Sequence, residues 1–258
     1  MENTMITRLL NLARPSVIAE GKAADQLGHA VSKIGGNPDL PTGFVWPIYG
    51  DQPLSFMAQI NLADVGELDA EQLLPRAGML SFFYELDSQE WGYDASSEGC
   101  ARVYYFPDPA ALISTPLPDD LDGDFRVDEQ VLTFTGRNSL PGMEEVERIF
   151  GQWPDWEIME EARRQADAPG AEEAYGLDGP HRLLGYPDVI QGDLFAQCAS
   201  LLGGEAGDWI LLFQMGTLST NGGCELMWGD CGKIYYCIRR SDLAQGNFDR
   251  IWLILQCG

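Results

Sequence analysis

The sequence predicts an α+β fold: an internally duplicated β-rich unit with mainly antiparallel sheets and peripheral helices. Apolar strand-like runs outnumber helical ones, and short connections join them, which disfavours a regular alternation of strands and helices. A loose repetition is the third observation, since three residues recur in order after 150, 155 and 154 positions. The pairs are Gly35 with Gly185, Gln59 with Gln214, and Gly78 with Gly232. A nearly constant offset indicates duplication of a supersecondary unit.

We expect one domain over residues 1–258, with repeats at approximately 33–106 and 181–258 and a connector at 107–180. The 258 residues are 45% hydrophobic and 10% aromatic, which is enough for a packed core.

In the first half, residues 2–14 carry an apolar face at helical spacing, and Pro15 ends that helix. Apolar runs bounded by turn residues predict strands at 16–20, 54–60, 79–86 and 102–106. Segment 35–55 is rich in glycine, proline and aromatic residues, so we expect a loop packed against the sheet.

In the connector, the residue pattern predicts one strand at 131–135 and two helices within 141–166. Pro141 suits a helix start, Pro154 interrupts the helical pattern, and Pro169 with Gly170 ends it. The second half predicts strands at 209–215, 233–239 and 250–256. It also predicts a helix near 193–202 and a short helix at 241–245, which Ser241 would cap.

The charge is strongly acidic, with 16 basic and 40 acidic side chains and a net charge of −24. The connector holds 5 basic and 18 acidic residues, a net charge of −13. Binding to nucleic acid or to anionic membranes is disfavoured, because both need Lys and Arg. A basic protein partner fits this charge, and so does a surface that only confers solubility.

No apolar run is long enough to span a bilayer, and the N-terminus lacks a secretory pattern, so we expect a soluble, cytoplasmic protein. Six cysteines form no C-x-x-C pair, which favours reduced thiols over a zinc site or disulfides.

The sequence predicts no catalytic, cofactor-binding or metal-ligating residue. Only two histidines are present, His29 and His181, and a structural role is favoured for His181. An EF-hand loop from Asp120 fails at Phe125 and Val131, so the acidic run there is interpreted as a solvated loop. Nucleophile-elbow, P-loop and dinucleotide-binding patterns are absent from the sequence.

Two glutamines lie inside apolar strands, where an amide must be satisfied. One interpretation is that Gln59 and Gln214 hold the adjacent Gly/Pro loops. The other is that they line a cleft between the repeats with three further candidates. The candidate ligand cleft then comprises Trp46, Gln59, Gln214, Trp228 and Asp230.

Several blocks together resemble the YwqG-like family, also called DUF1963, over most of residues 30–258. They are Gly35-Gly36-Asn37-Pro38, Val45-Trp46-Pro47, Phe56-Met57-Ala58-Gln59-Ile60, Leu74-Pro75, Gly78-Met79-Leu80-Ser81-Phe82-Phe83, His181-Arg182-Leu183-Leu184-Gly185-Tyr186-Pro187 and Met227-Trp228-Gly229-Asp230-Cys231-Gly232. The resemblance implies a bacterial, cytoplasmic α+β protein with an internal duplication. It implies no activity, because the family is one of unknown function.

The function expected first is a non-catalytic binding protein whose acidic surface engages a basic protein partner, for example an immunity protein against a nuclease toxin. The alternatives are a small-molecule binding protein or an enzyme, with a site in the cleft between the repeats.

Overall fold

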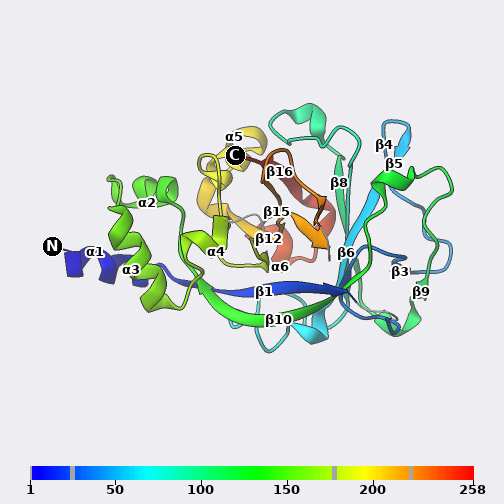
Figure 1. Cartoon of the computed structure of the whole chain (residues 1–258), viewed down its shortest axis with the longest axis horizontal. Coiled ribbons are helices and arrows are strands. Elements are labelled where there is room, and N and C mark those ends of the chain that lie inside the picture. Colours follow the sequence, from blue (N-terminus) through cyan, green and yellow to red (C-terminus); the bar gives the residue numbers. More distant parts are fainter. Residues whose placement is uncertain (1, 24–26, 176–178, 221–222) are drawn as a thin grey trace.

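A ten-stranded antiparallel sheet dominates the residues that the computed structural model describes, which are 2–23, 27–175, 179–220 and 223–258 (Figure 1). Across the sheet the strands follow the order β16-β15-β12-β11-β1-β10-β2-β6-β7-β8. Their bounds are β1 (Arg14–Ala23), β2 (Lys33–Ile34), β6 (Ser55–Asn61), β7 (Met79–Tyr84), β8 (Ala101–Phe106), β10 (Gln130–Ser139), β11 (His181–Leu183), β12 (Trp209–Met215), β15 (Lys233–Arg239) and β16 (Trp252–Gln256). The prediction of a mixed fold with antiparallel pairing is confirmed.

Smaller elements surround this sheet. Three two-stranded ladders pair β3 (Asp39–Leu40) with β9 (Ile113–Ser114), β4 (Ile48–Tyr49) with β5 (Gln52–Pro53), and β13 (Leu218–Thr220) with β14 (Gly223–Leu226). The α-helices are α1 (Glu2–Leu10), α2 (Met143–Phe150), α3 (Trp156–Ala166), α4 (Ala171–Tyr175), α5 (Leu194–Leu202) and α6 (Arg240–Ala244).

The long pair β1 and β10 forms the middle of the sheet. The two strands run antiparallel over ten residues each, from Arg14 opposite Ser139 to Ala23 opposite Gln130. Strands β11, β12, β15 and β16 lie on one side of this pair, and β2, β6, β7 and β8 lie on the other. The connector therefore contributes a central strand that joins the two halves.

The sheet is curled until it is nearly barrel-shaped, and the inner faces of its two ends pack on each other. The Phe82 ring of β7 lies 4.9 Å from Phe213 of β12 and 5.1 Å from Tyr236 of β15 between centroids. The ladder register shifts at Met57 in β6 and at Leu212 in β12. Such bulges bend a strand and increase its twist, which helps the sheet to curl.

The two edge strands, β8 and β16, approach each other along what we call the seam. Segment 85–100 bridges it: Trp252 Nε1 donates to the Gly92 carbonyl at 2.9 Å, and Leu255 N donates to Trp91 at 3.0 Å. The rings of Tyr105 and Phe248 add an apolar contact at 5.4 Å.

Two outer layers cover the opposite face of the sheet. Segment 35–54 packs Leu40 and Leu54 against Phe56 and Phe83, as expected for a loop rich in aromatic residues. Helix α5 packs Phe195 and its neighbours against β12, β15 and β16. Helices α1, α2 and α3 form a separate apolar cluster at one end of the long β1–β10 pair (Figure 1).

Most predicted elements agree with the structure, including strands 209–215 and 233–239 and the two helices on either side of Pro154. The predicted cap at Ser241 is wrong, because α6 already begins at Arg240 and Arg239 is its N-cap residue. Strands β1 and β10 extend well beyond 16–20 and 131–135, because ladder pairing continues where side chains are polar. Helix α4 was not predicted.

Candidate functional site

Gln59 in β6 is fully buried and holds the loop that follows β2. Its Oε1 accepts the backbone N–H of Asp39 at 2.8 Å. Its Nε2 donates to the Asp39 carboxylate at 2.7 Å and to the Val31 carbonyl at 2.9 Å. These bonds satisfy an amide inside an apolar strand, which agrees with the loop-holding interpretation.

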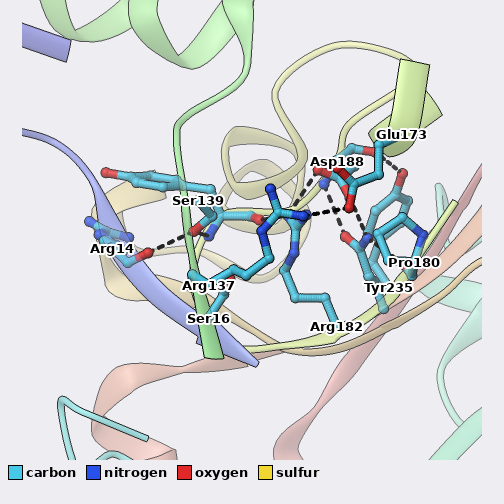
Figure 2. Close-up of polar contacts among 11 residues, drawn as sticks. Arg14, Ser16, Arg137, Ser139, Glu173, Pro180, Arg182, Asp188 and Tyr235 are labelled. Atoms are coloured by element: carbon cyan, nitrogen blue, oxygen red, sulfur yellow. Dashed lines mark hydrogen bonds and ion pairs between the residues drawn. The ribbon is translucent and has the colours of Figure 1, made fainter. Parts of the chain in front are cut away.

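Gln214 in β12 makes the corresponding bonds in the second half. Its Oε1 accepts the N–H of Asp188 at 2.9 Å, and its Nε2 donates to the Asp188 carboxylate at 2.7 Å. A third bond reaches the Pro180 carbonyl at 3.2 Å. Figure 2 shows Asp188 and Pro180 from the two segments that this amide ties together.

A cation lies opposite each glutamine in the sheet, but the two cations bind different partners. Arg182, opposite Gln214, donates Nη1 to the Asp188 carboxylate at 2.8 Å (Figure 2). Lys33, opposite Gln59, instead binds Glu129 at 2.7 Å. The two glutamine sites therefore share their amide bonds and differ in their ion pairs.

Sequence reasoning missed the two aspartates and the two cations of these sites. The signal that could have found them is the dipeptide Pro-Asp, at 38–39 and again at 187–188. The same offset of 149 relates Lys33 to Arg182. It also relates Gly36 to Gly185, and positive φ occurs at Gly35 and Gly36 as well as at Leu184 and Gly185.

The remaining members of the predicted cleft occupy separate positions. Trp46 donates Nε1 to the Leu54 carbonyl at 2.8 Å, within the outer layer. Trp228 is fully buried in the inner core, and its Nε1 donates to the Gly216 carbonyl at 2.9 Å. Asp230 is exposed in a turn.

Among the described residues, no hydrogen bond or ring contact joins any two of the five cleft candidates. A shared ligand cleft at these residues stays a prediction.

His181 is buried, and its Nδ1 accepts the backbone N–H of Gly216 at 3.1 Å. Burial lowers the pKa of His181, the nearby Lys233 ammonium acts in the same direction, and the two together bring it to about 4. The imidazole is therefore neutral at pH 7 and links β11 to the end of β12, which agrees with a structural role.

The connector carries its acidic groups in two distinct ways. In and next to its helices, carboxylates pair with arginines of the connector itself. The ion pairs are Glu145 with Arg148, Glu160 with Arg163, Glu161 with Arg164, and both Asp167 and Glu173 with Arg137. These pairs compensate part of the charge of residues 129–180, which hold 12 acidic and 4 basic side chains, a net charge of −8.

Residues 107–128, which we call the acidic loop, differ from the helical part. They contain six aspartates and one arginine, a net charge of −5. Arg126 turns back to donate to the carbonyls of Pro118 and Leu121. Among the described residues, none of the six aspartates makes an ion pair, and Asp119, Asp120, Asp124 and Asp128 are exposed.

Exposed aliphatic side chains lie on the elements next to the acidic loop. Val45 is 83% exposed and Ile48 is 65% exposed. Ile113, within the loop, is 49% exposed and pairs with Leu40 in the β3–β9 ladder. Figure 1 shows β3, β4, β5 and β9 gathered at one end of the molecule. The acidic loop and these neighbours therefore form an acidic surface with aliphatic side chains beside it.

Two features are absent from the described part of the chain. No helix there is long and apolar enough to cross a bilayer. No group of three or more His, Cys, Asp or Glu side chains is placed there to hold a metal ion.

A comparison with curated proteins finds no match to the chain. A family model, described as a domain of unknown function, matches residues 32–257, which excludes only α1, β1 and the extreme C-terminus among the main elements. The chain therefore belongs to the DUF1963 family.

Proposed function

We propose that this protein is a non-catalytic binding protein whose acidic loop engages a basic protein partner. The observation that carries the proposal is the contrast within the connector. Several carboxylates of its helical part pair with arginines of the connector, whereas the six aspartates of residues 107–128 make no ion pair among the described residues. Unpaired carboxylates keep their charge available to a partner.

Two features of the surface fit a protein partner rather than a simple counter-ion. The loop is anchored, because Thr115 N donates to Pro38 and Arg126 binds the carbonyls of Pro118 and Leu121. The exposed Val45, Ile48 and Ile113 offer apolar area beside the charge. Complementary charge speeds association and selects partners, while apolar contacts slow dissociation.

A concrete form of the proposal is an immunity protein that occludes the cationic active site of a nuclease toxin. This role places the protein in the bacterial cytoplasm, where cysteine thiols would stay reduced.

The test mixes the protein with the product of a neighbouring toxin-like gene and measures both complex formation and residual nuclease activity. One variant neutralises the loop with Asp119→Asn, Asp120→Asn, Asp124→Asn and Asp128→Asn. A matched control removes the same charge elsewhere with Glu147→Gln, Asp155→Asn, Glu157→Gln and Glu172→Gln. We expect the loop variant to weaken binding at least tenfold and the control to change it less than twofold.

Equal weakening by both variants would assign binding to net charge and reject the loop as the surface. Loss of toxicity without a complex would reject the immunity role.

We also infer that the two halves of the sheet descend from one duplicated unit. The matching bonds of Gln59 and Gln214 support this, as do the repeated Pro-Asp dipeptide and the strand bulges at Met57 and Leu212. In an alignment of family members, both Pro-Asp dipeptides and both glutamines should persist at these spacings. Independent loss of one set would argue against common descent.

A further inference from the structure

A hollow of about 360 Å³ opens at the seam, where the two ends of the curled sheet meet, and we call it the seam hollow. It is lined from the first half by Glu98, Gly99 and Arg102, and from the second half by residues of β12, β15, α5, α6, β16 and the turn before β16. Since one water takes roughly 30 Å³ of liquid volume, this space admits a small molecule.

Arginines are concentrated around the seam hollow. Arg102, Arg239 and Arg250 all line it, three of only sixteen basic residues in the chain. They come from β8, β15 and the turn before β16, so folding brings them together from three separate segments. Among the described residues, Arg102 and Arg239 make no ion pair.

The backbone is shaped to admit the Arg102 guanidinium. Gly99 has a φ of +97°, and a Cβ built there would lie 3.0 Å from Arg102 Nη2. A larger residue would be both strained and crowded at this position. Glycine therefore leaves room for the charged head at the edge of the hollow.

Two buried donors at the hollow have no partner. Trp209 is 2% exposed and its indole Nε1 makes no hydrogen bond, although a buried indole N–H normally has an acceptor. The Nε of Arg239 is also buried and unbonded, while its Nη2 donates to the carbonyls of Leu202 and Gly203. The Arg239 guanidinium lies 5.0 Å from the Trp209 ring centroid.

Three carboxylates also line the hollow, from Glu98, Asp242 and Asp249. Asp242 approaches Arg250 at 4.0 Å and so compensates part of that charge. The two buried groups without a partner are nevertheless both donors, and a donor is satisfied only by an acceptor. We propose that the seam hollow binds a small oxyanion, a carboxylate or phosphate group held by Arg102 and Arg239 with the indole N–H of Trp209.

The experiment follows the indole N–H resonance of Trp209 in ¹⁵N-labelled protein, assigned with Trp209→Phe. Sodium phosphate and sodium succinate are titrated separately, with sodium chloride at matched ionic strength as the reference. We expect a saturable shift with at least one of the two oxyanions and none with chloride. Saturation by phosphate alone assigns a phosphate ligand, and saturation by succinate alone assigns a carboxylate ligand.

Variants decide whether the arginines carry the binding. Arg102→Gln should weaken oxyanion binding at least tenfold. Arg250→Gln removes a second positive charge from the lining of the hollow. The Arg250 side chain is exposed, so this variant should fold readily and should also bind the oxyanion more weakly. The control Arg76→Gln, on a different surface, should stay within twofold of the parent protein. Absence of a saturable shift, or equal loss with Arg76→Gln, would overturn the proposal.

Discussion

The side chain of Gln214 binds Asp188 twice, accepting its backbone N–H at 2.9 Å and donating to its carboxylate at 2.7 Å. Both ends of one amide are thus fixed by one residue of the loop after β11. A carboxylate at position 214 could accept the N–H but would face the Asp188 carboxylate with a second negative charge. The pair therefore requires an amide and not merely a polar group.

We predict that Gln214→Glu destabilises the protein strongly at pH 7, because two carboxylates would meet in a buried site. Breaking a buried network of this kind costs about 3–5 kcal/mol. The loss should become smaller near pH 4–5, where the introduced acid can take up a proton and donate as the amide did. Urea unfolding at both pH values measures the effect.

The matched control for that experiment is Gln52→Glu, at an exposed position in β5. It should change the free energy of unfolding by less than about 0.5 kcal/mol, as exposed substitutions usually do. A Gln214→Glu protein as stable as this control would show that the amide is not needed.

The sequence predicts much of this sheet, because its strands are apolar runs bounded by glycine and proline. Strand β12 is predicted at its observed bounds since all seven of its residues are buried. Strand β10 is longer than predicted because its outer residues are held by pairing with β1, a contact between distant segments. Such pairing leaves no local pattern in a single sequence.

Glu145 provides a second prediction, concerning pH. Burial raises the pKa of Glu145, Asp193 acts in the same direction, Arg148 opposes the shift, and the resulting pKa is about 7. Since the folded-state pKa lies above the ordinary 4.5, the contribution to stability is full below about pH 4.5 and is lost as the pH rises to about 7.

Glu145→Gln should therefore raise the free energy of unfolding at pH 8, by roughly 1–3 kcal/mol, and change it little near pH 4.5. Guanidinium unfolding at the two pH values tests this. Glu147→Gln, at an exposed position two residues further along α2, should show no such difference. A stabilisation independent of pH would contradict the assignment.

His181 should make stability depend on pH in the opposite direction. Its pKa is lowered to about 4 by burial and by Lys233, so the unfolded chain takes up a proton before the folded protein does. Stability from the neutral imidazole is present above about pH 6.5 and is lost as the pH falls towards 4. The stability lost between pH 6.5 and pH 4 amounts to up to about 3 kcal/mol.

We predict that His181→Asn, which keeps an acceptor for the Gly216 N–H, has a smaller loss of stability between pH 6.5 and pH 4 than the parent protein. The measurement is thermal unfolding across that range, compared as a difference between the two proteins. An unchanged slope would show that His181 does not titrate as described.

The seam residues explain why the hollow could not be predicted from sequence. Arg102, Arg239 and Trp209 lie in different strands and share no spacing rule. They meet only because the two bulged halves curl and segment 85–100 crosses the edge. By contrast, Gln59 and Gln214 were found because each interrupts an apolar run, a signal visible within seven residues.

Thiol labelling tests whether the seam stays closed. Cys100 lies beneath it, 3% exposed, and burial raises the pKa of its thiol to about 12, whereas Cys231 is exposed. At pH 8 in native buffer, iodoacetamide should label Cys231 and leave Cys100 unmodified, because the reacting species is the thiolate. Peptide mass spectrometry gives both labelling rates, and unfolding in guanidinium should make them similar.

Native labelling of Cys100 at a rate near that of Cys231 would mean that segment 85–100 opens readily. The edges of the sheet would then be held mainly by the aromatic core around Phe82.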